Sequence, residues 1–379
     1  MLVISVMVYR NPIEHTVTFG YHMAADQWWA RRPVTNFFYF PHFIILYSPF
    51  HWLLPPWDEI IWRWFGAAGL GFGLWEFLRA TFRENNWQRF TLISLVTLPL
   101  MLGAVRNGQA NAHLAATLLF AAASLARERW WRAVFFLMLA VALKPLGLAA
   151  VGLAFAAFPL LRWRLAVGII LLTASLFCFG PADYVKTQIV GSVNALRGTS
   201  KVAEERFQTA DQKTSGRKPW FVKGAMARGF ADINGLLDVF GCALVGKIST
   251  VVRAFAGLVF AVGCWLAARR LDKNLVAPFW AAAAAAWLML FNPMNETNSY
   301  VILAPVIGWW CWYFREQSEW RLAWSLVAML LSMALLRNVL RPLLGGDGTN
   351  AFAAAFFPAM TLLFVGVVVA KTFFQKRAT

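Results

Sequence analysis

The chain repeats one pattern over most of its length: an apolar run close to the length of a membrane helix, followed by a short polar or basic connection. A helix needs about 20 predominantly apolar residues to cross the bilayer core. The pattern predicts such helices at about residues 60–78, 90–105, 110–126, 130–143, 146–161, 165–180, 254–268, 275–291, 299–314, 322–336 and 351–370. The sequence therefore predicts an all-α polytopic membrane protein with about 11–12 membrane helices.

One pair of these segments allows an alternative. Residues 133–161 would form a single tilted helix about 40 Å long at about 1.5 Å per residue, with Lys144 in its middle. That length is large for a hydrocarbon core of about 30 Å. Two helices broken at Lys144-Pro145 are the favoured prediction, because they keep the basic segments 127–132 and 162–164 on one side.

The N-terminal region has a different pattern. Met1–Val8 is apolar but too short to span, and we expect it to end a first helix that starts upstream. Within residues 10–38, four residues recur at helical spacing and predict an amphipathic helix on the outer membrane surface: Tyr21, Ala24, Trp28 and Trp29. Residues 39–57 are apolar but rich in proline, which predicts a broken, re-entrant segment, with a short spanning helix as the alternative.

A polar stretch divides the chain. Residues 181–233 predict one long extracytoplasmic loop, whose middle (200–218) is expected to be mobile. The predicted organisation is an N-terminal membrane module at 1–180, which includes the outer segment 10–58, then the loop, then C-terminal membrane helices at 234–379.

Composition agrees with a membrane protein. The chain is 60% hydrophobic and 14% charged, against about 45–50% and about 25% in soluble domains. The formal charge of +17 reflects Lys and Arg in short connections, where they interleave with Trp as at a membrane interface. We therefore expect membrane lipid, and no nucleic acid, as a partner.

The basic residues also predict the orientation. Most Lys and Arg residues at the ends of the predicted spans fall on one face, which is therefore predicted to be cytoplasmic. The segments 106–111, 181–233 and 291–300 and Lys144 then lie on the extracytoplasmic side.

A dense polar element precedes the 110–126 helix and is the main candidate site. It contains Arg106, Asn107, Gln109 and Asn111, and the predicted helical hairpin returns Lys144 to the same side. Two cations at one membrane surface can hold one phosphate. The alternative is a capped turn at the interface with a snorkelling lysine.

Other polar residues are weaker candidates. Arg253, Arg337 and Arg341 lie at outer membrane ends and are possible substrate contacts, with interface anchors as the alternative. Asn295 and Asn298, beside Glu296, are further possible contacts, with a hydrogen-bonded loop as the alternative. Three carboxylates are candidates for a catalytic base: Glu14, Asp26 and Glu296. Asp58 and Glu59 are predicted to cap the 60–78 helix. The five histidines show no metal-ligand spacing, and Asp-x-Asp is absent, so the sequence predicts no metal or cofactor.

Three motifs in order resemble glycosyltransferase family 87, which consists of membrane enzymes of the GT-C fold: GQANAHL (108–114), ALKPLG (142–147) and NPMNETNSYVILAP (292–305). The segments YHMAADQWW and FYFPHFIILYSPF are similar to the aromatic helix and re-entrant segment of that family.

The resemblance implies a function. It implies transfer of a hexose, typically mannose, from a polyprenyl-phosphate donor to a glycan or glycolipid acceptor, with inversion and without a metal. The reaction is expected on the extracytoplasmic side of a bacterial plasma membrane. The usual base of the family is an Asp four residues before a Tyr, but Val17 stands four residues before Tyr21. Glu14 is therefore preferred as the base, ahead of Asp26 and Glu296.

Two other classes of protein would account for some of these features. A transporter or flippase for a lipid-linked or anionic solute would also use buried Arg and Lys, but it often shows internal repeats, which this sequence lacks. A non-catalytic membrane scaffold has no use for polar clusters gathered at one leaflet.

Overall fold

The structure is a computed structural model that describes residues 1–11, 16–35, 37–84, 86–213, 230–242, 244, 246–292 and 295–374. Side chains at 197, 199–213, 246, 337 and 347 lie outside this description. The chain forms two units. The first comprises Met1–Glu84, Met101–Val151 and Phe158–Thr199, and the second comprises Asn85–Leu100, Gly152–Ala157 and Ser200–Thr379.

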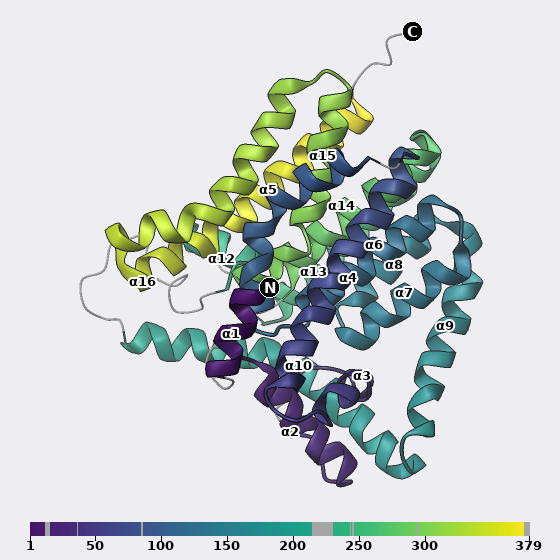
Figure 1. Ribbon diagram of the computed structural model, residues 1–379, viewed down its shortest axis with the longest axis vertical. Helices are drawn as coiled ribbons and strands as arrows, with labels where there is room; N and C mark the ends of the chain where they lie inside the picture. The colour runs from purple at the N-terminus through teal and green to yellow at the C-terminus, as the bar shows by residue number, and fades with distance from the viewer. Residues whose placement is uncertain are drawn as a thin grey trace. The chain divides into compact units, whose positions relative to one another are not determined.

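Helices build both units (Figure 1). The helices of the first unit are α1 (Leu2–Arg10), α2 (Thr18–Trp29), α3 (Pro41–His51), α4 (Trp57–Phe82), α6 (Asn111–Ala126), α7 (Trp130–Leu143) and α9 (Arg162–Ser175). Those of the second are α12 (Ile233–Leu237), α13 (Gly246–Arg270), α14 (Lys273–Phe291), α15 (Ala304–Glu316) and α16 (Trp320–Phe373). Residues of α5 (Trp87–Arg106), α8 (Gly147–Ala157) and α10 (Ala182–Lys213) belong to both units.

The predicted apolar segments all contain helices, and the described residues contain no strand, so the prediction of an all-α polytopic membrane protein is confirmed. Five helical stretches in the described chain are long and apolar enough to cross a membrane: Trp87–Arg106, Pro159–Cys178, Lys247–Arg270, Lys273–Phe291 and Gly348–Phe374. The bent pair Trp320–Leu336 and Asn338–Gly346 would make a sixth. The apolar helices α6, α7 and α8 are shorter than a full span.

The segment around Lys144 forms two helices, as predicted. Lys144 has extended backbone angles (φ −150°, ψ 132°) and ends α7. The amide of Gly147 donates to the Lys144 carbonyl at 2.9 Å, which turns the chain into α8. A Cβ atom at Gly147 would lie 2.6 Å from the main chain of Ala140 and Val141, so only glycine allows this close return.

The irregular backbone expected of the loop at 181–233 is not found over Ala182–Lys213, while its extracytoplasmic position and the mobility of residues 200–218 stay predictions. Residues Ala182–Lys213 form the 32-residue helix α10. This stretch contains no proline, and most of its residues have fair or good helix propensity. Polarity therefore indicated solvent exposure, but it did not indicate an irregular backbone. The division of the chain at 180 and 233 stays a prediction.

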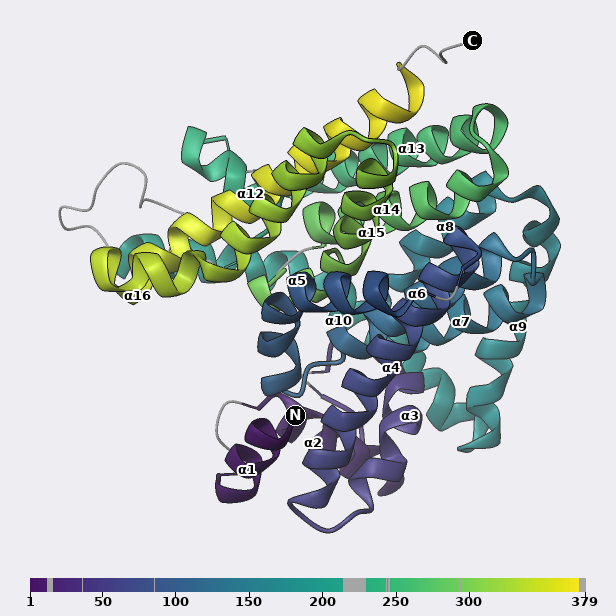
Figure 2. The ribbon, with the colours of Figure 1, turned by 45° about the horizontal axis from the view of Figure 1, so that its top comes forward.

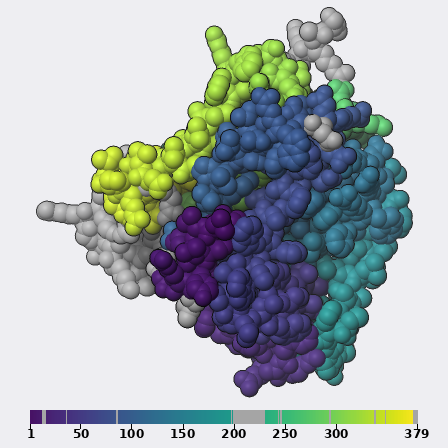
Figure 3. Space-filling model, viewed as in Figure 1, coloured from purple at the N-terminus to yellow at the C-terminus, as the bar shows by residue number. Residues whose placement is uncertain are grey.

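The N-terminal helices pack together at one end of α4. Of the four residues predicted to form the apolar face of α2, Tyr21, Ala24 and Trp28 are buried and Trp29 is half-buried. The three buried residues form one aromatic core with Phe43 of α3 and Trp62 of α4. The position of α2 on the membrane surface stays a prediction. Figure 2 shows α2 and α3 beside the start of α4, and Figure 3 shows α1 lying against α4. The region 39–57 thus holds an 11-residue helix that is too short to span.

Small residues bring α4 and α6 into close contact. A Cβ atom added at Gly73 would lie 3.0 Å from the Ala116 carbonyl oxygen, and one added at Gly66 would lie 2.7 Å from the His113 ring. Glycine at these positions allows the helix backbones to approach, as is typical of membrane helix pairs. This contact fixes the start of α6 relative to the start of α4.

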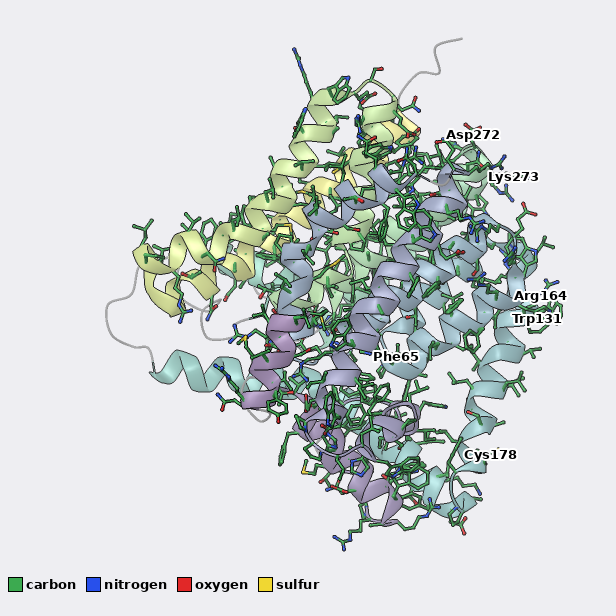
Figure 4. The ribbon with its side chains drawn as sticks, in the orientation of Figure 1. Phe65, Trp131, Arg164, Cys178, Asp272 and Lys273 are labelled. Atoms are coloured by element: carbon green, nitrogen blue, oxygen red, sulfur yellow. The ribbon has the colours of Figure 1, made fainter. Side chains whose placement is uncertain are left out.

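Basic and aromatic side chains meet at the predicted cytoplasmic ends of the helices in the first unit. Arg164 lies beside Trp131 in Figure 4, and its guanidinium carbon is 5.9 Å from the centre of that ring. Arg127 donates to Glu76 at 2.5 Å. The interleaving of Arg and Trp in the sequence therefore corresponds to direct contacts at helix ends.

Candidate functional site

The polar element between α5 and α6 is a glycine-terminated helix end. Gly108 has φ +64°, the left-handed conformation. Its amide donates to the Val105 carbonyl, and the Gln109 amide donates to the Ala104 carbonyl, each at 3.1 Å. These two bonds form a Schellman motif, which satisfies the last carbonyls of a helix and needs glycine at the left-handed position. The motif holds Gln109 and the following Asn111 at the start of α6.

Lys144 lies against this element. Its ammonium donates to Asn111 Oδ1 at 2.6 Å, and the Asn111 amide donates to Gln109 Oε1 at 2.7 Å. Asn111 and Gln109 are buried, while Lys144 is half-buried. The ammonium is 6.0 Å from the centre of the Tyr39 ring. We call Gln109, Asn111, Lys144 and Tyr39 the lysine–amide cluster.

Tyrosines join this cluster to α2. The hydroxyls of Tyr21 and Tyr39 lie 3.3 Å apart, and the Ala110 amide donates to the Tyr21 hydroxyl at 3.4 Å. Tyr21 is buried at the centre of the aromatic core. A half-buried ammonium beside side-chain amides can bind an anionic group.

Arg106 lies at the same helix end as the cluster but in a different environment. Its side chain is exposed, and its main-chain carbonyl accepts from Arg63 Nε at 3.2 Å. Asn107 is half-buried, and its carbonyl accepts from the Val17 amide at 3.1 Å. The element thus contributes the Asn111 side chain, which is bonded to Gln109, to the contact with Lys144. It supplies the main chain of Arg106 and Asn107 to neighbouring segments.

A buried ion pair packs against the polar element between α5 and α6. Arg63 donates to Glu59 one helical turn earlier on α4, and Glu59 also accepts from Thr18 of α2. A Cβ atom added at Gly108 would lie 3.0 Å from Arg63 Nη2 and 2.9 Å from Thr18 Cγ2. Arg63 and Glu59 are both buried. Their packing fixes where the helix end sits.

The expectation that Asp58 and Glu59 cap the 60–78 helix is wrong. The N-terminus of α4 has no side-chain capping bond, although both acids lie in its first turn. Both carboxylates instead turn inward, because α2 brings His22 and Thr18 against them. Adjacent acids followed by Arg63 four residues later were a detectable signal of pairing along the helix.

A line of imidazoles and carboxylates runs outward from Asp58. The Nε2 atom of His22 is 2.9 Å from Asp58 Oδ2, and His22 Nδ1 is 2.9 Å from His51 Nδ1. His51 Nε2 is 3.3 Å from Asp26 Oδ1, whose side chain is 72% exposed. The Tyr47 hydroxyl is 2.8 Å from His22 Nε2. Burial lowers the pKa of His22 below its ordinary value, and the nearby Asp58 carboxylate opposes this effect. We call Asp58, His22, His51 and Asp26 the histidine–carboxylate line.

The three candidate bases lie in different places. Glu14 lies outside the described residues. Asp26 ends the histidine–carboxylate line at the surface. Glu296 is exposed in the second unit, just before the short 3-10 helix η5 (Thr297–Val301). Their roles as bases stay predictions.

The remaining candidates belong to the second unit. Asn295 is fully buried, and its amide donates to the main-chain carbonyls of Ala231 and Met289 at 3.1 and 3.0 Å. These bonds join segments of the second unit to one another and so have a structural role. Asn298 and Arg253 are half-buried and Arg341 is exposed, while the side chain of Arg337 lies outside the described part. Substrate contact by these residues stays a prediction.

The described residues include one group with the donor types and spacing for a metal ion. Possible ligand atoms of His22, Asp58 and Glu59 all lie within 4.8 Å of one another. The sequence prediction of no metal site rested on spacing along the chain. That spacing gives no signal here, because α2 and α4 bring together residues that are far apart in the sequence.

Comparison with known proteins identifies a family. The family model named Glycosyltransferase family 87 matches residues 37–293. The matched range includes Tyr39, Gln109, Asn111 and Lys144, and it begins after α2. A search of curated proteins finds no match to the chain.

Proposed function

The chain belongs to glycosyltransferase family 87 and is a membrane glycosyltransferase; on that premise, we propose that it transfers a hexose from a polyprenyl-phosphate donor to an acceptor hydroxyl. The hexose is mannose or a related sugar, and the acceptor is a glycan or glycolipid. The transfer takes place on the extracytoplasmic side of a bacterial plasma membrane.

The lysine–amide cluster supports this proposal most directly. The Lys144 ammonium is half-buried and held 2.6 Å from the Asn111 amide oxygen. Holding a lysine ammonium where little water reaches it costs free energy, unless the ammonium binds an anionic group. The phosphodiester of a lipid-linked sugar is such a partner, and its polyprenyl chain stays in the bilayer while its phosphate meets the ammonium.

Arg106 supplies a second cation in the proposal. Its side chain is exposed at the end of α5, and the α5–α6 connection leads from it to Asn111, the first residue of α6. We expect the guanidinium to close over the phosphate when the donor binds, with Asn107 at the rim and Gln109 and Asn111 behind it. The two cations then stabilise the negative charge that grows on the leaving phosphate oxygen.

The proposed reaction is a single displacement. The acceptor oxygen attacks the anomeric carbon and forms the new glycosidic bond, while the bond from that carbon to the phosphate oxygen breaks. The hydroxyl proton passes to a carboxylate, with Glu14 preferred over Asp26 and Glu296. The products are the glycosylated acceptor, with inverted configuration at the anomeric carbon, and polyprenyl phosphate.

The test uses the full chain in liposomes with a labelled polyprenyl-phosphate-mannose and candidate acceptors. We expect release of polyprenyl phosphate together with a glycosylated product. A Lys144→Met variant should release it about 10²-fold more slowly, and Lys186→Met, which removes an exposed lysine of α10, should match the wild type. Movement of intact donor across the bilayer without release would instead indicate a transporter or flippase.

A further inference from the structure

We propose that His22, Asp58 and Glu59 bind one divalent transition-metal ion, for example Mn²⁺. The three residues come from α2 and the first turn of α4, and their possible ligand atoms lie within 4.8 Å of one another. Asp58 and Glu59 are buried and His22 is half-buried. The proposed transfer reaction makes no use of this group.

The spacing of two of these groups matches adjacent metal ligands. His22 Nε2 and Asp58 Oδ2 lie 2.9 Å apart. Two ligand atoms that are each about 2.1 Å from an ion, at right angles, are about 3.0 Å from each other. An ion can therefore enter between the imidazole and the carboxylate with little movement of either side chain.

One oxygen of the Asp58 carboxylate is buried without a hydrogen-bond partner in the part of the chain that the structure describes. Asp58 is 3% exposed, and its Oδ1 atom is buried without a hydrogen-bond partner in the described residues. Burying a charged oxygen without a partner costs several kcal/mol, and native structures rarely leave such an atom unsatisfied. A metal ion held by both carboxylate oxygens of Asp58 would supply the missing partner of Oδ1.

The outer hydrogen bonds select the form of His22 that binds metals. His22 Nδ1 faces His51 Nδ1 at 2.9 Å, and His51 Nε2 faces the Asp26 carboxylate at 3.3 Å. With both rings neutral, His51 donates from Nε2 to Asp26, so its Nδ1 accepts the proton of His22 Nδ1. The Nε2 atom of His22 is then unprotonated and accepts from the Tyr47 hydroxyl at 2.8 Å, a bond that a bound ion would replace. Ligating histidines are commonly oriented by an outer carboxylate in this way.

Glu59 completes a donor set of one nitrogen and carboxylate oxygens. Its Oε1 atom accepts from Thr18, and its Oε2 atom accepts from Arg63 and Thr16. A carboxylate has about four acceptor positions, so one position on Oε1 remains for an ion. Together Asp58, Glu59 and Arg63 carry one net negative charge, which favours a cation. Imidazole with carboxylates suits Mn²⁺ or Zn²⁺ better than ions that prefer sulfur ligands.

The test measures metal binding to the full chain in detergent after treatment with EDTA. Titration with MnCl₂, followed by the electron paramagnetic resonance signal of free Mn²⁺, should show one ion bound per chain. The variants His22→Ala and Asp58→Asn should each weaken binding at least about 10-fold. The matched control is His42→Ala on α3, whose ring bonds the Leu172 carbonyl and lies outside the group. It should bind as the wild type does.

A second measurement covers variants that do not fold. Spin-echo modulation of Mn²⁺ bound to the wild type should show coupling to one imidazole nitrogen. Absence of Mn²⁺ and Zn²⁺ uptake at concentrations up to about 1 mM would overturn the proposal. It would also be overturned if both ligand variants bound Mn²⁺ with wild-type affinity, or if bound Mn²⁺ showed no coupling to nitrogen. Lys144→Met should leave Mn²⁺ binding unchanged, so failure of this site and failure of the proposed transfer are distinguishable.

Discussion

Replacement of Lys144 by methionine tests the proposed donor site. Methionine keeps most of the length and apolar stem of lysine but removes the charge that contacts Asn111 at 2.6 Å. A charge-assisted hydrogen bond contributes about 1.5–3 kcal/mol, and about 1.4 kcal/mol corresponds to a tenfold change in rate. The expected loss of kcat/KM is therefore about 10- to 150-fold.

The division of this loss between kcat and KM carries further information. If Lys144 stabilises charge that develops on the leaving phosphate, kcat falls. If it only binds the donor, KM rises while kcat stays the same. We predict that kcat accounts for much of the loss, and that Lys144→Arg recovers part of it because the charge is kept.

The assay is the initial rate of polyprenyl phosphate release in liposomes over a range of donor concentrations. Lys186→Met provides the control, since it removes a lysine from an exposed position of α10. The melting temperature of each variant shows whether it is folded. A folded Lys144→Met protein with the turnover of the control would refute the role given to the ammonium.

Three further predictions concern the support of the cluster. Arg63→Met leaves the buried Glu59 carboxylate unpaired and should lower the free energy of unfolding by about 3–5 kcal/mol. In denaturation followed by Trp fluorescence, the double variant with Glu59→Gln should lose less stability than the sum of the two single losses. Strict additivity would argue against the pair. Gly108→Ala should cost at least about 1–2 kcal/mol for the left-handed backbone alone, and an unchanged melting temperature would contradict the motif. Asn111→Ala removes the oxygen that holds Lys144 and should slow transfer about 10-fold. If the variant's transfer rate matched that of the wild type over a range of donor concentrations, Asn111 would not position Lys144.

The positions of the helices were predictable because membrane helices leave a strong signal in apolar length. The break at Lys144 was predictable for a similar reason, since one helix through it would be too long for the bilayer. The helix α10 was not predicted, because its polar composition resembles that of a loop and its helicity comes from residue propensities.

The candidate site was predictable where short connections determine contacts. A basic turn joins α6 and α7, so the start of one helix and the end of the other return to the same level, and Lys144 meets Asn111. The contacts of His22 with Asp58 and His51 were not predictable from the sequence. They arise from the packing of three helices around one aromatic core, and no spacing along the chain encodes that packing.

We propose above that this membrane glycosyltransferase uses a polyprenyl-phosphate sugar held at the lysine–amide cluster. The most direct measurement supplies purified protein in liposomes with polyprenyl-phosphate-mannose labelled in both the sugar and the lipid, together with a mixture of glycan and glycolipid acceptors. We expect the sugar label to move to an acceptor while the lipid label appears as polyprenyl phosphate, and we expect Lys144→Met to slow both together. Sugar transfer that proceeds from another donor while the two labels stay joined would contradict the proposal.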